Sequence, residues 1–295
     1  MWASGSRNGR ARQKKWRGPQ SFQRKAGGVF GAALVKYAMS EILQPASVAS
    51  IYRYPVKGLS PEKLPEVALT PGQTLPGDRR YAIENGPSGF DPAEPKHFPK
   101  IKYLMLMREE RLAALDTRYD DAGGTLSIRA GDTEASGDLR TADGRAAIEG
   151  YFAAHFADEL RGPPRVLQAD GFSFSDVAAK VVSIINLASV AAIEDMVGAP
   201  VHPLRFRGNL HVTGWPAWHE FDLLGKTLAL GDIRLKVVKR IVRCAAVNVD
   251  PETAARDMQI PKALMQNLGH ADCGVYAEVI TGGTLVPGAT IVVEE

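Results

Sequence analysis

The stretch Val238-Lys-Arg-Ile-Val-Arg-Cys-Ala-Ala-Val-Asn-Val-Asp-Pro-Glu-Thr253 joins a β-forming run to one of the chain's two cysteines. Cys244 directly follows a cation, Arg243, and the Asn248-Val-Asp-Pro251 segment then turns the chain away, so the sulfur is expected at a strand end. A neighbouring cation favours the thiolate form of a cysteine, which is the nucleophile and the soft metal ligand. A lone cysteine is also commonly a small buried apolar residue. The choice between a reactive and a packed thiol therefore depends on the rest of the sequence.

Composition excludes several classes of protein. The chain has 295 residues, of which 45% are hydrophobic and 23% charged, as is typical of a soluble globular protein. It contains no uncharged apolar run of about 18 residues, so no membrane span is expected. Two cysteines are too few for a disulfide framework, a Cys-rich zinc site or an iron–sulfur cluster. They are expected to be thiols of a cytoplasmic protein.

The positive net charge belongs to the N-terminal segment. Residues 1–38 hold nine basic residues and no acidic one, which leaves 27 basic against 33 acidic residues, or a net charge of −6, in residues 39–295. No nucleic-acid partner is therefore expected for the folded body. Residues 1–47 are predicted to be a disordered basic head or a mispredicted translation start. We favour the mispredicted start, because a strand pattern begins soon after Met39. A transit peptide and a nucleic-acid-binding arm are the alternatives.

Short β patterns dominate the first half. The alternation in Val48–Val56 predicts a strand, and further strands are expected near residues 66–69, 80–83, 103–107, 113–117 and 125–129. Gly and Pro clusters between them are typical of a sandwich or barrel. We therefore expect a mainly β fold with some helix (α+β).

The second half adds helices and a hairpin. Apolar residues at helical spacing around residues 148–156 predict a helix with Asp143 as its N-cap. Asn186 is expected to cap a second helix over residues 187–197, which ends at Gly198. Gly231-Asp232 lies between two β patterns and predicts a two-residue hairpin turn that leads into the Cys244 segment.

Cations lie where several predicted strands end. Lys57, Arg79, Arg205 and Arg207 are of this kind, and the helix start at residues 186–189 offers free backbone N–H groups. Such groups together would bind a multiply negative ligand. Each cation alone could equally be a solvated surface charge. The Arg205-Phe-Arg207 segment fits that alternative less well. Its apolar neighbours predict that it is buried, and a buried arginine needs a partner.

The order of short motifs resembles that of the MOSC-domain proteins, the superfamily of the molybdenum cofactor sulfurase C-terminal domain. The motifs are Tyr54-Pro-Val-Lys57, Gly77-Asp-Arg79, Arg205-Phe-Arg-Gly-Asn209, Trp218-His-Glu220, Leu230-Gly-Asp232, Arg243-Cys244, Asn248-Val-Asp-Pro-Glu-Thr253 and Cys273-Gly-Val-Tyr276. The resemblance covers residues 48–293. It is greatest to two-part members, such as the mitochondrial amidoxime-reducing component and the bacterial YcbX-type proteins. It implies an N-terminal MOSC β-barrel domain over residues 48–140 and a MOSC β-barrel domain over residues 141–295.

The resemblance also implies a cofactor, a molybdenum held by one pyranopterin dithiolene and by the thiolate of Cys244. The cofactor-binding residues that it implies are Lys57, Arg79, Asn186, Ser189, Arg205, Arg207, Asn209 and Cys244. Gly58 stands where members often have serine, and Arg207-Gly-Asn209 replaces the common Arg-Pro-Asn. The segment of residues 95–100 lacks the Thr-Ala-Arg run of some members, which leaves roles for Lys96 and His97 open.

The function implied is that of a molybdenum cofactor-dependent oxidoreductase that reduces N-hydroxylated compounds to amines. The chain has no Cys-rich tail, so the electrons are expected from a separate flavin or iron–sulfur protein. The alternative is a non-catalytic carrier of the cofactor or of sulfur. A third hypothesis is a cysteine hydrolase, in which His270 and Asp272 would act with Cys244. Cys273 is expected to be a packed thiol.

Overall fold

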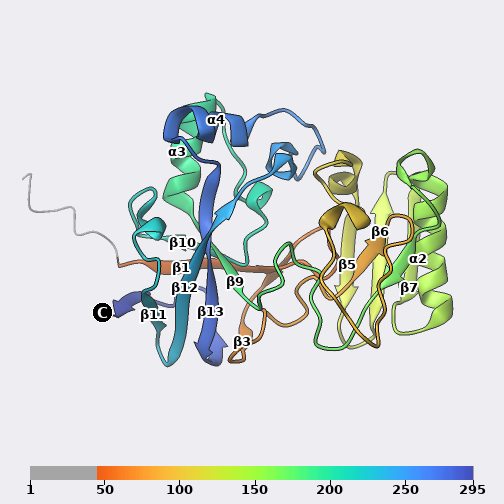
Figure 1. Ribbon diagram of the computed structural model, residues 1–295, viewed down its shortest axis with the longest axis horizontal. Coiled ribbons are helices and arrows are strands. Elements are labelled where there is room, and N and C mark those ends of the chain that lie inside the picture. The colour runs from red at the N-terminus through yellow and green to blue at the C-terminus, as the bar shows by residue number, and fades with distance from the viewer. Residues whose placement is uncertain (1–44, 295) are drawn as a thin grey trace, which may run out of the picture. The chain divides into compact units, whose positions relative to one another are not determined.

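The computed structural model describes residues 45–294, so the predicted head lies outside the described residues except for its last three. The described residues belong to one compact unit. Its largest element is an eight-stranded sheet in the order β15-β11-β12-β13-β9-β10-β1-β2 (Figure 1). Every neighbouring pair is antiparallel except β9 and β10. The strands are β1 (Ser47–Arg53), β2 (Glu62–Leu64), β9 (Val182–Asn186), β10 (Leu210–Thr213), β11 (Thr227–Leu230), β12 (Ile233–Val242), β13 (Asp272–Thr281) and β15 (Val292–Glu294).

The sheet curls until the start of β1 meets the segment that precedes β15. The backbone N–H of Val48 donates to Ala289 O at 3.0 Å, and that of Ile291 donates to Ala46 O at 2.7 Å. These bonds join β1 to the segment that precedes β15, which gives the sheet a barrel-like closure and removes a free edge.

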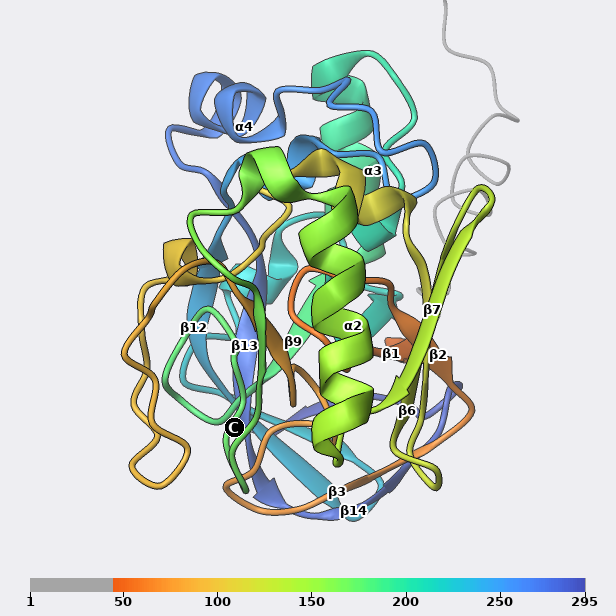
Figure 2. The same ribbon diagram turned by 90° about the vertical axis from the view of Figure 1, so that its right-hand side faces the viewer.

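Smaller sheets and the first helix complete the β part. A meander of β5 (Asp116–Asp120), β6 (Thr125–Ala130) and β7 (Thr133–Asp138) is covered by α2 (Ala142–His155), as Figure 2 shows. Two further pairs join strands that are distant in sequence. They are β3 (Val67–Leu69) with β14 (Gly283–Leu285), and β4 (Ala82–Glu84) with β8 (Arg165–Leu167). The predicted mainly β fold with some helix is confirmed.

The remaining helices lie together at one end of the large sheet (Figure 1). They are α3 (Leu187–Val197) and α4 (Ile260–Leu268), which share an apolar cluster that includes Val190 and Leu264. Short 3-10 turns connect the elements: η1 (Lys100–Lys102), η2 (Glu110–Ala114), η3 (Ala157–Glu159), η4 (Pro203–Phe206), η5 (His219–Phe221) and η6 (Ala245–Asn248). Within residues 45–294 the structure has no helix of the length and apolarity that a membrane crossing requires.

Local sequence signals predicted several boundaries correctly. The Asn186 side chain caps α3 by accepting from the Ala188 N–H at 3.1 Å, and Gly198 ends the helix with a φ of 72°. Leu230 pairs with Ile233 across the predicted Gly231-Asp232 turn. A left-handed glycine at the end of a helix satisfies carbonyls that no helical N–H can reach.

Two local predictions were wrong and a third was displaced, because the strand expected near residues 113–117 is β5, which begins at Asp116 after the turn η2. Residues 103–107 form no strand; only Tyr103 makes an isolated bridge, to Glu84, and the segment then turns. Asp143 is not the N-cap of α2, because Thr141 accepts the hydrogen bond from Gly144 N–H at 3.0 Å. Asp143 lies in the first turn, where its charge still complements the helix dipole.

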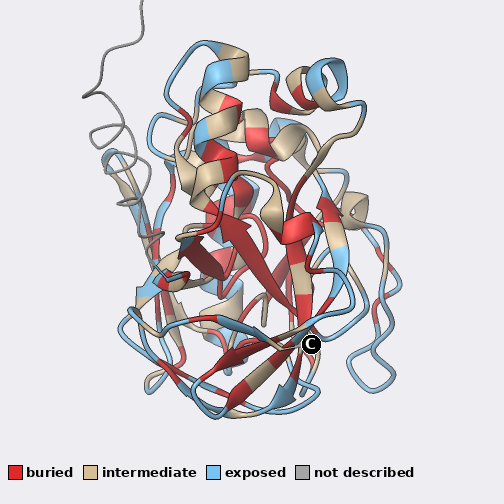
Figure 3. Cartoon of the chain, turned by 90° about the vertical axis from the view of Figure 1, so that its left-hand side faces the viewer, coloured by how far each residue is buried: buried red, intermediate tan, exposed pale blue. Residues whose placement is uncertain are grey.

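A buried polar network ties α3 to the turn after β10. Glu220 is fully buried and accepts from Asn186 Nδ2 and from Ser189 Oγ, each at 2.9 Å. Ser189 Oγ in turn accepts from the Trp218 N–H at 2.8 Å. In Figure 3 the strands at the centre of the sheet are coloured as buried, whereas the helices next to them also carry intermediate and exposed residues.

Removal of the Glu220 carboxylate should therefore destabilise the fold. Glu220→Ala leaves buried donors of Asn186 and Ser189 without an acceptor, and we expect it to lower the free energy of unfolding by about 3 kcal/mol. Urea denaturation measures the change, with Glu66→Ala, at an exposed position, as the control. Equal stability of the two variants would contradict a structural role for the network.

Candidate functional site

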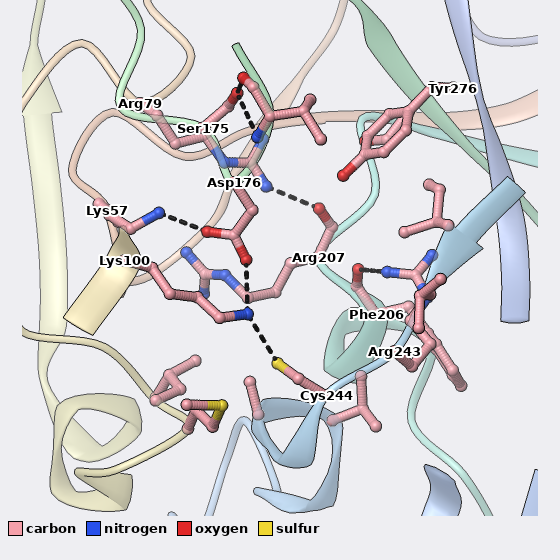
Figure 4. Close-up of a pocket in the computed structure, with 18 of the residues that line it drawn as sticks. Lys57, Arg79, Lys100, Ser175, Asp176, Phe206, Arg207, Arg243, Cys244 and Tyr276 are labelled. Carbon is pink, nitrogen blue, oxygen red and sulfur yellow. Dashed lines mark hydrogen bonds and ion pairs between the residues drawn. The ribbon is translucent and has the colours of Figure 1, made fainter. Parts of the chain in front are cut away.

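A cavity of about 310 Å³ opens beside the end of β12. Its walls come from segments far apart in the sequence, on both sides of residue 140. Figure 4 shows the following lining residues: Lys57, Arg79, Lys100, Ser175, Asp176, Phe206, Arg207, Arg243, Cys244 and Tyr276.

Cys244 lies at a strand end, as its sequence context predicts. The strand β12 ends at Val242, and Cys244 stands in extended conformation directly before η6. The pairing of β12 with β13 shifts between Val237 and Lys239, which is a bulge that redirects the following residues. Cys244 is partly exposed and lines the cavity.

The cation beside the sulfur is not the one that the sequence suggested. Arg243 donates to backbone carbonyls, from Nε to Cys273 O at 2.7 Å and from Nη1 to Phe206 O at 2.9 Å. Lys100 Nζ instead lies 3.3 Å from Cys244 Sγ (Figure 4). Arg243, the cation next to Cys244 in the sequence, therefore binds backbone carbonyls. The cation closest to the sulfur is Lys100, which is distant in the sequence and begins η1.

Lys57 and Lys100 share one carboxylate. The ammonium group of Lys57, a residue only 7% exposed, donates to Asp176 Oδ1 at 2.5 Å and to Phe174 O at 2.8 Å. Lys100 Nζ donates to Asp176 Oδ2 at 3.1 Å. Burial raises the pKa of Asp176, but the two lysines lower it more, so it lies well below its ordinary range. Burial lowers the pKa of Lys57 more than Asp176 raises it.

Two arginines enclose a buried tyrosine ring. The guanidinium carbons of Arg79 and Arg207 lie 4.4 Å and 4.2 Å from the centroid of the Tyr54 ring. Such contacts attract a cation to the face of the ring. Burial raises the pKa of Tyr54 to about 12, although both guanidinium groups act to lower it. The backbone also joins Tyr54 to Arg79, since the Arg79 N–H donates to Tyr54 O at 2.7 Å.

Arg207 has unused binding capacity. Its Nη2 is buried and has no hydrogen-bond partner among the described residues. Burial lowers the pKa of Arg207 to about 10, so the side chain remains charged at neutral pH. Arg79 and Arg207 also hold left-handed backbone conformations, with φ of 50° and 51°. A buried cationic donor without an acceptor is costly, and an anion in the cavity would relieve that cost.

The other residues implied by the resemblance lie differently. Asn209 lines the cavity, but its Oδ1 accepts from Ser183 N–H and its Nδ2 donates to Tyr52 O. The guanidinium group of Arg205 forms salt bridges to Asp250 and Asp257, at 2.7 Å and 2.8 Å. The structure places Asn186 and Ser189 away from the cavity, bound to Glu220. Lys96, which is exposed, and His97 do not line the cavity either.

The residues of the hydrolase hypothesis do not gather around Cys244. His270 and Asp272 are absent from the cavity wall, and the His270 ring contacts Phe221, with centroids 5.5 Å apart. Cys273 is fully buried, and burial raises its pKa to about 12. It packs in an apolar cluster, as predicted for a structural thiol.

Lys100 and Asp176 were missed by the sequence analysis. Asp176 stands in an irregular loop and Lys100 begins the short 3-10 turn η1, so neither strand alternation nor helical spacing marks them. Lys100 falls at the end of the 95–100 segment, which lacks the Thr-Ala-Arg run of some members and carries no other motif. Only the packing of the loops brings the two side chains to Cys244 (Figure 4).

Comparison with protein families identifies the chain. The family model of the MOSC N-terminal beta barrel domain matches residues 45–158, and that of the MOSC domain matches residues 154–292. The chain is a MOSC-domain protein. The expected pair of MOSC domains is confirmed, whereas the boundary at residue 140 stays a prediction.

Solved structures similar to this MOSC protein share little sequence with it. YiiM from Geobacillus stearothermophilus is 23% identical, with a TM-score of 0.32, over 39% of this chain and 54% of YiiM. YuaD from Bacillus subtilis is 13% identical, with a TM-score of 0.40, over 85% of this chain and 96% of YuaD. The MOSC protein thus matches about half the length of YiiM. No curated protein matches the chain.

The ion pairs of Asp176 predict a pH-dependent contribution to stability. Because the folded pKa of Asp176 lies below its ordinary value of 3.8, the contribution is present above about pH 4 and is lost as the pH falls toward the folded value. Asp176→Asn should lower the free energy of unfolding at pH 7 by about 1 kcal/mol, a modest amount because solvent reaches and screens the carboxylate.

Urea denaturation at pH 7 and pH 3 checks this expectation. The difference between the natural protein and Asp176→Asn should shrink at the lower pH. The exposed Asp170→Asn serves as the control. A difference that stays constant or grows would contradict the ionic role of Asp176.

Proposed function

We propose that this MOSC protein binds the molybdenum cofactor in the cavity, with Cys244 as the protein ligand to molybdenum. The family is associated with molybdenum cofactor binding and with sulfurase-like proteins. The observation that carries the proposal is the juxtaposition of a partly exposed thiol with buried cations, one of which has an unpaired nitrogen. A soft sulfur ligand suits molybdenum that already carries dithiolene sulfurs, and fixed cations suit a phosphate group.

The chain's own residues would hold the cofactor by charge. Lys57, Arg79 and Arg207 are cations that line the cavity with mostly covered side chains, and we assign them to the phosphate and the pterin edge. Asp176 lies between Lys57 and Lys100 and balances part of their charge, which leaves Arg207 as a cation of the cavity that has no carboxylate within ion-pair distance among the described residues. The Tyr54 ring fixes the orientation of the Arg79 and Arg207 side chains. These side chains therefore lose little conformational entropy when the cofactor binds.

The proposed reaction is the reduction of an N-hydroxylated compound. The N–O bond of R–NHOH breaks, and two electrons and two protons convert it to R–NH2 and water. The molybdenum cofactor supplies the two-electron chemistry when it is bound. We assign the return of the electrons to a separate redox protein. The residues of the cavity would bind and orient the cofactor, and Lys100 would keep a positive charge beside the sulfur.

Loss of the thiol should abolish metal retention. Cys244→Ala removes the proposed protein ligand, and we expect its molybdenum content to fall at least tenfold in protein produced with intact cofactor synthesis. Elemental mass spectrometry measures the content. Cys273→Ala is the matched control, because that thiol is fully buried and does not line the cavity. Full molybdenum content in Cys244→Ala would refute the assignment.

A turnover assay separates the enzyme from a carrier. Molybdenum-loaded protein receives an artificial reductant and an N-hydroxylated compound, and formation of the amine is measured. Turnover supports the proposed oxidoreductase. Tight retention of the cofactor without turnover would instead favour a non-catalytic carrier of the cofactor or of sulfur.

A further inference from the structure

Asp176 places a carboxylate of the chain itself among the cations of the cavity. It accepts from Lys57 Nζ at 2.5 Å and from Lys100 Nζ at 3.1 Å. An ammonium group has three N–H donors. Lys57 uses a second donor on Phe174 O, and Lys100 has its second contact with Cys244 Sγ. Each lysine therefore has at most one donor left for a ligand, although an anion in the cavity needs these same ammonium groups.

The loop that carries Asp176 is weakly held. We call residues 175–180 the strap. The strap belongs to no helix or strand, and it forms no backbone–backbone hydrogen bond with any described residue. Apart from the pairs of Asp176, its contacts are a 3.0 Å approach of His97 Nε2 to Ser175 O and a hydrogen bond from Lys180 Nζ to Gln73 Oε1 at 2.8 Å. A segment with so few bonds opens at a low cost in free energy.

Both ends of the strap are anchored in the fold. On one side, the Phe174 N–H donates to Arg79 O at 2.8 Å, and the Phe174 ring packs against Phe90 with centroids 5.0 Å apart. On the other side, Val181 is only 7% exposed, and β9 begins directly after it. Opening of the strap would therefore leave the rest of the fold in place.

The strap is also part of the cavity wall. Its first three residues line the cavity, and the last three are exposed to solvent. In Figure 4 the Asp176 side chain lies between Lys57 and Lys100. This side chain is 44% exposed, so water can solvate the carboxylate as it leaves the lysines. Its departure would free two ammonium groups at once.

We propose that Asp176 is an internal competitor of the anionic ligand: a phosphate group that binds at Lys57 and Lys100 displaces the carboxylate and opens the strap. This inference rests on the anion site of the proposed function, but not on its metal or its reaction. Two anions beside the same ammonium groups repel each other. Asp176 thus lowers the affinity of the cavity for anions, and a ligand must form several ion pairs to hold the strap open.

Titration with inorganic phosphate measures this competition. The full chain is prepared without the cofactor, and binding is followed by phosphorus NMR. For Asp176→Asn we expect about tenfold tighter binding than for the natural protein, because the repelling carboxylate is gone. The control, Asp170→Asn, changes an exposed residue that does not line the cavity. A merely structural Asp176 predicts the opposite sign, so unchanged or weaker binding by Asp176→Asn overturns the inference.

A second measurement follows the strap itself, because loss of a negative charge also favours anion binding from a distance. Trypsin can cleave after Lys180 once the strap opens, whereas Val181 on the other side of that bond is buried in the closed form. We expect saturating phosphate to raise the cleavage rate of the natural protein at Lys180 about threefold or more, since proteolysis follows the population of the open form. Asp176→Asn should be cleaved faster even without phosphate.

Cleavage after Lys226, an exposed lysine that does not line the cavity, is the internal control and should not change. Mass spectrometry of the fragments distinguishes the two positions. Phosphate that binds but leaves the cleavage at Lys180 unchanged, or slows it, would show that the anion binds beside Asp176. That result overturns the proposed displacement.

These outcomes are separate from those of the proposed function. If the protein produced with intact cofactor synthesis retains no molybdenum, the proposed function fails. Tighter phosphate binding by Asp176→Asn, together with an opened strap, would still support the inference. Conversely, if neither the natural protein nor Asp176→Asn binds phosphate, the inference is overturned even where molybdenum is retained.

Discussion

Lys57, Arg79, Lys100 and Arg207 bring like charges into a cavity of about 310 Å³, and the surrounding structure must offset their repulsion. Asp176 does so for the two lysines, while Asp78 pairs with Arg79. Arg207 has the face of an aromatic ring and no carboxylate within ion-pair distance among the described residues. The charge is thus only partly balanced, and the pKa of Arg207 is depressed as a result of its burial. A cavity in this electrostatic state is prepared for an anion.

The sequence predicted those parts of the site that secondary structure places. Cys244 ends a strand and Lys57 follows one, and both positions can be recognised from β patterns and turns. The cap at Asn186 was predicted as well, but its chemistry was misjudged: an amide at a helix start can serve the fold as readily as a ligand. Lys100 and Asp176 could not be found in this way, because loop packing obeys no short period.

Two arginines also show how little a local sequence pattern says about the partners of a side chain. Arg205 and Arg207 are two residues apart, and no local pattern distinguishes their roles. In the structure the guanidinium group of Arg205 forms salt bridges to Asp250 and Asp257, whereas that of Arg207 lies against Tyr54 and has no carboxylate within ion-pair distance among the described residues. Such choices depend on partners many residues away, which a local pattern does not encode.

The closure of the large sheet has a consequence for biosynthesis. β1 pairs with β10 and is bonded to Ala289, near the opposite end of the described chain. During translation β2 follows this strand closely, but β10 and the segment around Ala289 leave the ribosome much later, so one edge of β1 stays without its partners until then. Pairings of such high contact order form slowly. The nascent protein is thus exposed to misassembly for most of its synthesis, and a chaperone that shields β1 would gain it more time than one that acts at any later strand.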